Sequence, residues 1–446
     1  MPFIPNSDQD RHDMLKAIGV ETFSDLIRMI PDDALFEGEL DLPEPLNELE
    51  VRRTLDALSR ENENCDDHIC FLGGGAYDHY VPAAVKHIIQ RSEFYTAYTP
   101  YQPEVSQGTL QSIYEYQTMI CELTGMDVAN ASMYDGGSAL AEAALLACAT
   151  TRRNTILVSA TVNPNYVEII KTYCHGRGIN VVTLPRDNHA VFLQTLEKQI
   201  NDRTAAVIFQ HPNYLGYFEP VEEIARLTKE SGALLISSND PISLTVLRPP
   251  ADYGVDIATG EGQALGNPLS YGGPYLGIFA SDKKFVRKIP GRIVGKTVDK
   301  NGQPGFVLTL QTREQHIRRE KATSNICTNQ GLNALAATVY MALMGKQGLP
   351  EVATQCLQKS HYLAGEISKL DGFGIKFDAP FFKEFVVQTS HPVDKVMQVC
   401  RENKVFAGIP LKNYDDNLSD CFLCAVTEKR TKKEMDAFIN ILRELL

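Results

Sequence analysis

A tyrosine-rich loop carries the side chains best suited to hold a small polar ligand. Tyr95, Tyr98 and Tyr101 recur at every third residue, and prolines at positions 100 and 103 exclude a helix interior there. We expect an ordered, extended loop that presents phenol groups together with the amides of Gln102 and Gln107. The alternative is a tyrosine-rich loop that packs on the body of a domain.

A second segment, Asp135-Gly136-Gly137-Ser138, could bind an anion at the start of an expected helix. Its glycines allow a close approach to the backbone, and the free N–H groups and the dipole of a helix start favour negative charge. The same residues could instead form a tight turn in which Ser138 caps the helix. Because short turns of this kind are common, the sequence leaves both interpretations open.

Alternating strands and helices must position these segments. Between about 110 and 290, short apolar runs alternate with longer amphipathic ones. The expected strands are 155–160, 180–185, 205–210 and 233–238, and the expected helices are 111–125, one starting at Gly136, 164–176, 190–200 and 221–231. Such βαβ units predict an α/β fold with a mostly parallel sheet and helices on both of its faces.

The two ends of the chain differ from this middle part. The first 65 residues are acidic and helix-like, and we expect an arm that wraps the body or a partner. After Gly331, helical patterns at 332–347, 351–370, 392–403 and 432–445 enclose apolar strands at 384–390 and 421–426. We therefore expect an N-terminal helical arm (1–65), a large α/β domain (66–330) and a small C-terminal α/β domain (331–446).

Composition narrows the possible classes of protein. The chain is 43% hydrophobic and 22% charged, which is typical of a soluble globular protein, and its net charge of −13 argues against nonspecific nucleic-acid binding. No apolar run reaches the roughly 20 residues of a membrane span, and the N-terminus is too polar for a signal peptide. Ten scattered cysteines form no disulfide pattern, and His68, His79 and His87 lack metal-ligand spacing. We expect a cytoplasmic protein without a metal.

Several segments together resemble the glycine cleavage system P-protein family. They are CFLGGGAYDHYVPAAV (70–85), YTPYQPEVSQG (98–108), MDVANASMYDGGSALAEA (126–143), NPLSYGGPYLG (267–277) and RREKATSNICTNQGL (318–332). Enzymes of that family decarboxylate glycine with pyridoxal phosphate (PLP). The resemblance spans nearly the whole chain and implies that the large domain has the aminotransferase-like fold of type I PLP enzymes. The length matches the smaller of the two subunits into which this enzyme is split in some bacteria.

One departure from active PLP enzymes concerns a missing lysine. The resemblance implies that a lysine, which holds the cofactor aldehyde, should follow the strand that begins near Asp256-Ile257. Gln263 or Ala264 occupies that place, and the nearest lysines, Lys283 and Lys284, begin the next expected helix. The carboxylate expected after the strand at 233–238 is also absent, because Asp240 comes two residues late. The chain therefore resembles a PLP-enzyme fold that has lost its own cofactor chemistry.

The resemblance also implies a partner. In the P-protein family two pseudo-symmetric halves pair, and the other half carries the lysine, so this chain would be the non-lysine subunit. We expect PLP to be held covalently by the partner and glycine to bind there, with a lipoyl H-protein accepting the aminomethyl group. The residues expected to complete the partner's site are Tyr95, Tyr98, Tyr101, Gln102 and Gln107, with Thr323, Ser324 and Asn325 as candidates for the partner's cofactor phosphate. Gly136, Gly137 and Ser138 would be a relic phosphate cup.

Two other functions remain open at this stage. The chain could be a structural or regulatory paralogue that stabilises the partner and touches no ligand. It could also be a self-sufficient PLP enzyme whose lysine comes from elsewhere in the sequence, although the Gln263 region argues against this. The segment around Thr323–Asn325 could equally be a polar loop that caps the following helix.

Overall fold

The computed structural model describes residues 5–36, 38, 40–191, 193–322 and 324–445, and it divides into two compact units, Met1–Glu63 and Asn64–Leu446. The N-terminal unit contains α1 (Asp8–Ile18), α2 (Phe23–Leu26) and α3 (Glu48–Arg60). Ser7, Thr22 and Asn47 each form a capping box at the start of one of these helices. None of the three helices buries a residue, so local capping, rather than a core, accounts for their formation.

The second unit is built around a seven-stranded sheet. Its strands, in spatial order, are β2 (Val128–Ala129), β10 (Gly277–Ser281), β9 (Ile257–Glu261), β8 (Leu234–Asn239), β7 (Thr204–His211), β3 (Thr155–Ser159) and β4 (Asn180–Leu184). The strands from β9 to β4 are parallel, whereas β10 runs antiparallel to both of its neighbours. The predicted strands at 155–160, 180–185, 205–210 and 233–238 are thereby confirmed, as is the mostly parallel sheet.

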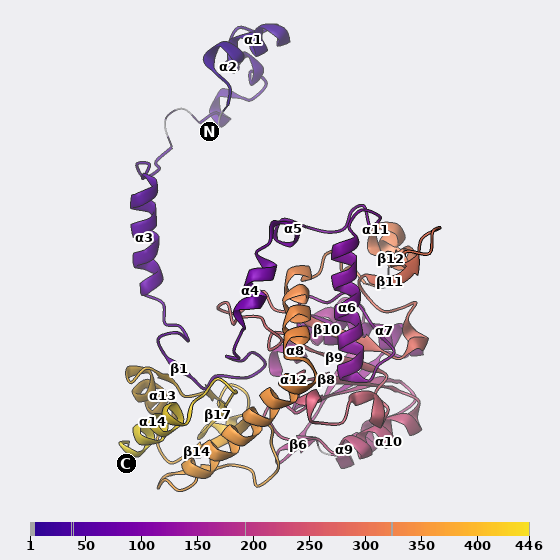
Figure 1. Cartoon of the computed structure of the whole chain (residues 1–446), viewed down its shortest axis with the longest axis vertical. Coiled ribbons are helices and arrows are strands. Elements are labelled where there is room, and N and C mark those ends of the chain that lie inside the picture. The colour runs from indigo at the N-terminus through magenta and orange to yellow at the C-terminus, as the bar shows by residue number, and fades with distance from the viewer. Residues whose placement is uncertain (1–4, 37, 39, 192, 323, 446) are drawn as a thin grey trace. The chain divides into compact units, whose positions relative to one another are not determined.

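Helices cover both faces of this sheet (Figure 1). One face packs against α7 (Gly136–Thr151) and α8 (Pro164–His175), whose apolar residues join a core with β3, β7 and β8. The other face packs against α6 (Gln107–Thr124), α9 (Leu193–Gln199), α10 (Val221–Ser231) and the first part of α12 (Gly331–Ile367). The helix α4 (Ala83–Ile89) contacts α12, and the short α5 (Ser92–Tyr95) follows it.

The long helix α12 links this core to a second one. It bends at Gly345, whose φ of 59° and ψ of −165° are not helical, and this explains why the sequence shows two helical patterns. Beyond the bend, α12 packs against β14 and α14 (Figure 1). No helix in the described part of the chain, α12 included, is long and apolar enough to cross a membrane.

The second core surrounds a four-stranded sheet in the order β13 (Phe373–Ile375), β14 (Glu384–Thr389), β17 (Cys421–Ala425) and β16 (Ile409–Pro410). The helices α13 (Val393–Glu402) and α14 (Lys432–Arg443) complete it. Phe71 and Tyr217 from the earlier part of the chain also belong to this core, and β1 (Ile69–Cys70) pairs with β15 (Val405–Phe406). The division at residue 330 stays a prediction.

The remaining elements lie outside these two sheets. They are the hairpins β5 (Arg186–Asp187) with β6 (Ala190–Val191) and β11 (Ile293–Val298) with β12 (Pro304–Thr309), and the one-turn helix α11 (Gln315–Arg318). Lys283 and Lys284 begin a 3-10 turn of three residues rather than the predicted helix, and Asp282 is the N-cap residue of this turn.

Candidate functional site

The first residues of α7 are already engaged within the chain. Asp135 is the N-cap residue, and its side chain accepts a hydrogen bond from the Ser138 N–H at 2.7 Å. The Gly136 N–H donates instead to Oε2 of Glu261, at 2.9 Å. The helix start therefore holds two carboxyl groups from the protein itself, one from the cap and one from the end of β9.

Glu261 lies deep in the fold and receives two further backbone hydrogen bonds. The N–H groups of Gln263 and Leu276 both donate to its Oε1 at 3.0 Å. Burial raises the pKa of Glu261 to about 8, against the opposing effect of these N–H donors. A carboxyl group thus fills the place where the free amides of the helix start would otherwise meet an external anion.

Gln263, which with Ala264 is one of the two residues predicted at the place of the missing lysine, pairs with the backbone of another segment. Its Oε1 accepts from the Tyr77 N–H at 2.9 Å, and its Nε2 donates to the carbonyls of Tyr77 and Asn267 at 3.1 and 2.8 Å. All three of these hydrogen bonds are buried. Gln263 therefore joins the end of β9 to the segment that leads toward α4.

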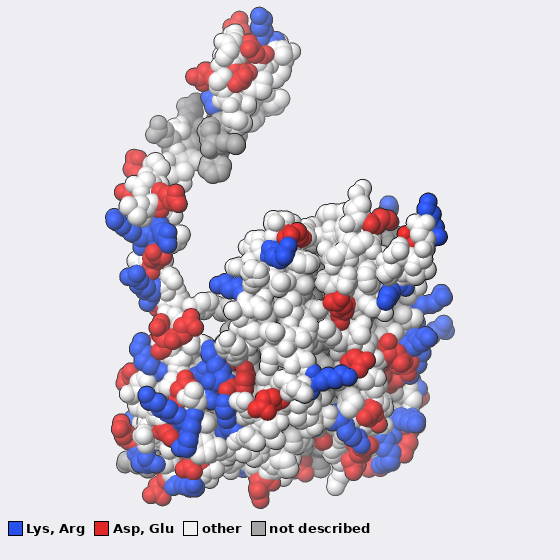
Figure 2. All heavy atoms as spheres, viewed as in Figure 1, with Lys and Arg blue, Asp and Glu red and all other residues white. Residues whose placement is uncertain are grey.

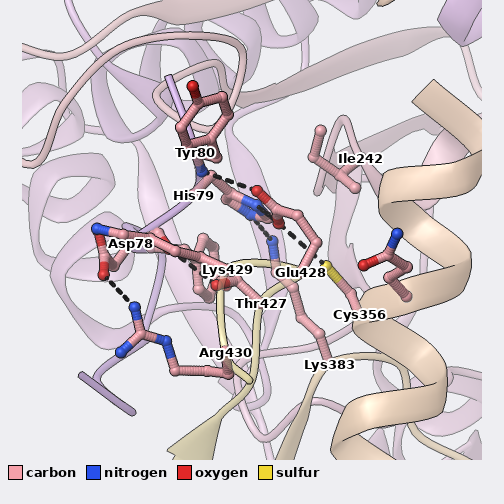
Figure 3. Close-up of polar contacts among 12 residues, drawn as sticks. Asp78, His79, Tyr80, Ile242, Cys356, Lys383, Thr427, Glu428, Lys429 and Arg430 are labelled. Atoms are coloured by element: carbon pink, nitrogen blue, oxygen red, sulfur yellow. Dashed lines mark hydrogen bonds and ion pairs between the residues drawn. The ribbon is translucent and has the colours of Figure 1, made fainter. Parts of the chain in front are cut away.

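Tyr77 and Glu261 line a pocket that a lysine does enter. This lysine comes from the segment between β13 and β14 rather than from the end of β9. Lys383 is almost completely buried, and its ammonium lies 2.5 Å from Oδ2 of Asp240 and 3.5 Å from the centre of the Tyr77 ring. The same ammonium lies 3.2 Å from Nε2 of His79 (Figure 3). The carboxylate and the aromatic face thus hold the end of this side chain in place.

His79 and its neighbours extend this network toward the C-terminal segment (Figure 3). Because an ammonium can only donate, Nε2 of His79 accepts from Lys383, and Nδ1 carries the hydrogen toward Glu428 at 2.6 Å. The Cys356 thiol donates to the same carboxylate at 3.6 Å. The ligand atoms of His79, Cys356 and Glu428 lie within 4.8 Å of one another, but they satisfy each other beside a fixed positive charge, so we assign no metal to them.

Little space remains in this pocket. Glu384 accepts from the Gly74 N–H and the Tyr77 hydroxyl, both at 2.7 Å, and burial raises its pKa to about 7. The cavity that these side chains leave measures about 30 Å³, enough for about one water molecule. A PLP molecule does not fit in a cavity of this size, and the amides of Gly136, Gln263 and Leu276 are already bound to Glu261.

The tyrosine-rich loop has the opposite character. Tyr95 ends α5, and the side chains of Tyr95, Tyr98 and Tyr101 are 66%, 72% and 77% exposed. Gln102 is exposed as well. The rings of Tyr98 and Tyr101 lie 6.2 Å apart and contact each other rather than the core. The loop thus presents its phenol groups to the outside, and its role in binding a ligand or a partner stays a prediction.

A groove of about 390 Å³ brings the two predicted loops together. Tyr98 lines it from the first loop, and Asn329 and Gln330 line it from the segment that follows Ser324 and Asn325. Arg292 also lines the groove, and among the described residues its side chain has no ion pair. This cationic residue was missed from the sequence, because an isolated arginine in the run Pro290-Gly291-Arg292 carries no motif signal.

Two expected site residues turn inward instead. Nε2 of Gln107 donates to the Phe306 carbonyl at 3.0 Å, and Oε1 of Gln107 accepts from the Phe306 N–H at 2.8 Å. The Gln107 side chain therefore anchors α6 to β12 rather than facing a ligand. The Ser324 hydroxyl is buried and donates to Glu142 at 2.9 Å. Asn325 is exposed, and Thr323 lies outside the described residues.

His211 has the structural role that the end of a strand suggests. Its Nδ1 accepts from the Glu219 N–H at 3.2 Å, and burial lowers its pKa to about 4, so the ring is neutral. Its ring packs against Phe218 and Tyr253 and is absent from the pocket lining.

Comparisons with known proteins agree with this geometry. Residues 1–442 match the family model described as "Glycine cleavage system P-protein". The chain is 56% identical, over the full length of both sequences, to the "Probable glycine dehydrogenase (decarboxylating) subunit 1" of Chloroherpeton thalassium. It is 54% identical to the protein of the same description from Carboxydothermus hydrogenoformans, over 99% of each.

Solved structures give the same result. A crystal structure of glycine decarboxylase (P-protein) of the glycine cleavage system, in inhibitor-bound form, is 41% identical and superimposes with a TM-score of 0.92 over the whole of both chains. A NifS-like protein, 14% identical with a TM-score of 0.63, covers 85% of this chain and 99% of its own length and shares the fold alone. The predicted fold class is thereby confirmed.

Proposed function

The chain belongs to the glycine cleavage system P-protein family, and from that membership we propose that it is the non-lysine subunit of a two-subunit glycine decarboxylase. Its exposed loops would complete a PLP site whose lysine belongs to the partner subunit. PLP, when bound, supplies an electron sink for the decarboxylation of glycine. This chain would bind and orient groups at the edge of that site.

The observation that carries this proposal is the contrast between the closed pocket and the open groove. The chain's own pocket has no lysine after β9 and about 30 Å³ of free space, so it offers no place for covalent catalysis. The groove measures about 390 Å³ and is lined by Tyr98, Arg292 and Gln330, whereas the Asn329 amide donates to Ala131 and Ser132 of the chain itself. A subunit that acts on a partner's cofactor needs this combination.

The surface around the loop supports a macromolecular partner. Tyr95, Tyr98, Tyr101 and Val105 are each more than 60% exposed. Figure 2 shows that the face over α4, α5 and the upper part of α6 carries few charged side chains compared with the face over α9, α10 and the C-terminal sheet. Aromatic residues that gather where charge is sparse are typical of the buried centre of a protein interface.

Within such a complex the groove's chemistry matches an anionic ligand. Arg292 offers a fork of donors suited to a carboxylate or a phosphate, and Tyr98 and Gln330 offer a hydroxyl and an amide group beside it. Glycine carries a carboxylate and PLP carries a phosphate, so either could approach this edge. The aminomethyl group would then pass to a lipoyl H-protein.

Glycine–bicarbonate exchange tests the proposal. The full chain, a lysine-bearing P-protein subunit, and the mixture of both are each assayed with PLP and H-protein. We expect exchange only in the mixture. Exchange by this chain alone would show that its pocket accepts the cofactor, and full exchange by the partner alone would show that the groove is not needed.

A further inference from the structure

We propose that Glu261 is a built-in replacement for a phosphate: its carboxyl group occupies the anion position at the start of α7 and closes the chain's own cofactor pocket. This inference goes beyond the proposed function, because it concerns the pocket that performs no catalysis. Phosphate binding to this chain alone tests it, so no assay of the complex is needed.

Three backbone N–H groups from three separate segments converge on this one side chain. Gly136 begins α7, Gln263 follows β9, and Leu276 precedes β10. Their N–H groups lie 2.9, 3.0 and 3.0 Å from the two Glu261 oxygens. Backbone amides that converge on one point, one of them at a helix start, form an anion-binding cradle. Here the cradle is filled from within the chain.

The cradle leaves room for one occupant only. A Cβ atom on Gly136 would lie 2.9 Å from the Tyr166 hydroxyl and 3.1 Å from the Glu261 nitrogen, so glycine is required for the backbone to come this close. Glu261 itself is 9% exposed. An external phosphate would need the same three amides, and it would also meet a buried carboxyl group at the same place.

Glu261 occupies the cradle whether or not its carboxyl group is ionised. Each N–H requires only an acceptor oxygen, and the ionised and the protonated carboxyl both supply one. Among the described residues Glu261 has no ion pair, so no salt bridge draws it away from the amides. Glu261 therefore fills the cradle on either side of its raised pKa of about 8.

Calorimetric titration of the full chain with inorganic phosphate, at constant ionic strength set with chloride, tests this directly. Glu261→Ala empties the cradle and frees its three amide donors, so we expect saturable binding of one phosphate per chain, at least about 10-fold tighter than any residual association with the wild type. The wild type should show no saturable binding.

Glu261→Gln is the matched control. The amide keeps the size of the side chain and still fills the cradle, so it should bind no phosphate although the carboxyl group is gone. Saturable binding to the wild type, or no binding to a folded Glu261→Ala variant, would overturn the proposal.

Instability of Glu261→Ala would not remove the test. If this variant does not fold in chloride, it is refolded at rising phosphate concentrations beside Glu261→Gln. The proposal predicts phosphate-dependent recovery of the Ala variant, because phosphate supplies the acceptor that the three amides lost. Equal behaviour of the two variants in phosphate and chloride would contradict it.

Discussion

The buried pocket and the open groove are two polar clusters in the unit Asn64–Leu446, and they differ in how their polar groups are used. In the pocket, Glu261, Gln263 and Lys383 bind other groups of the chain, and about 30 Å³ stays free. In the groove, Tyr98 and Arg292 border about 390 Å³ and have no such partners within the described residues. The pocket stabilises the fold, and the groove is available for binding.

This difference shows that the position of a pocket in a fold does not by itself make it a ligand-binding site. The pocket lies near the carboxyl ends of β7, β8 and β9, the usual place for ligands in α/β sheets. Its side chains now hold the segment that includes Gly74, Tyr77 and His79. Groove variants should therefore change activity, and pocket variants should change stability.

Arg292 should give the largest effect on activity. Arg292→Ala removes the cation of the groove, and we expect kcat/KM for glycine–bicarbonate exchange by the mixed subunits to fall about 10- to 100-fold, because a hydrogen bond to a charged group contributes about 1.5–3 kcal/mol. Arg203→Ala, which removes an exposed arginine that does not line the groove, is the matched control and should leave kcat/KM unchanged. Equal losses in both variants would break the assignment.

Gln263 should affect stability instead. Gln263→Ala removes the hydrogen-bond partner of the buried Tyr77 N–H and of the Asn267 carbonyl, so we expect the free energy of unfolding to fall by about 1–3 kcal/mol in urea denaturation. Gln263→Lys should be destabilised similarly and should give the isolated chain no exchange activity. Activity in that variant would show that the pocket admits the cofactor after all.

Glu384 should make stability depend on pH. Burial raises its folded-state pKa from 4.5 to about 7, so the folded state binds the proton more tightly than the unfolded state. The resulting stability is fully present below pH 4.5 and is lost as pH rises through about 7.

Glu384→Gln should remove the part of this dependence that Glu384 contributes, while the part from Glu261, whose pKa is raised to about 8, stays. We expect the wild type to lose about 1–2 kcal/mol more than the variant between pH 5 and pH 8, measured by urea denaturation at each pH. Parallel pH profiles for the two proteins would mean that Glu384 has an ordinary pKa.

Tyr98 should give the smallest of these effects. Tyr98→Ala removes the ring that the loop contributes to the groove, and we expect kcat/KM to fall by about 10-fold or less. Thermal stability should stay unchanged, because this ring is mostly exposed. Tyr98→Phe separates the ring from its hydroxyl. Unchanged exchange in the Ala variant would favour a structural paralogue that touches no ligand.

The periodic parts of the fold were predictable from the sequence. The alternating apolar runs placed β3, β4, β7 and β8 and the helices between them within a few residues, because hydrophobic periodicity follows burial. A break in α12 could be anticipated from Pro350, which lies between the two helical patterns, whereas the bend itself lies at Gly345, inside the first pattern. The antiparallel β10 could not, because strand direction depends on long-range pairing.

The site was predictable only in part. The absence of a lysine after Asp256-Ile257 could be noticed only through the family resemblance, whereas the exposed tyrosines could be inferred from local residue types. Lys383 could not, because it reaches Asp240 from a distant strand. Glu261 did leave a signal, as an acidic residue at the end of an otherwise buried strand, where a carboxyl group needs partners. Gln107 and Ser324 have the right residue types, but their side chains bind inward.

The most direct test of the account locates the cofactor in the assembled enzyme. The complex of this chain with a lysine-bearing partner subunit is loaded with PLP and reduced with borohydride, and the labelled peptide of each subunit is identified by mass spectrometry. The account predicts that the label lies only on the partner's lysine, with one PLP for each pair of unlike subunits. A stoichiometric label on this chain, at Lys383 or any other lysine, would contradict the central claim that its own pocket is closed.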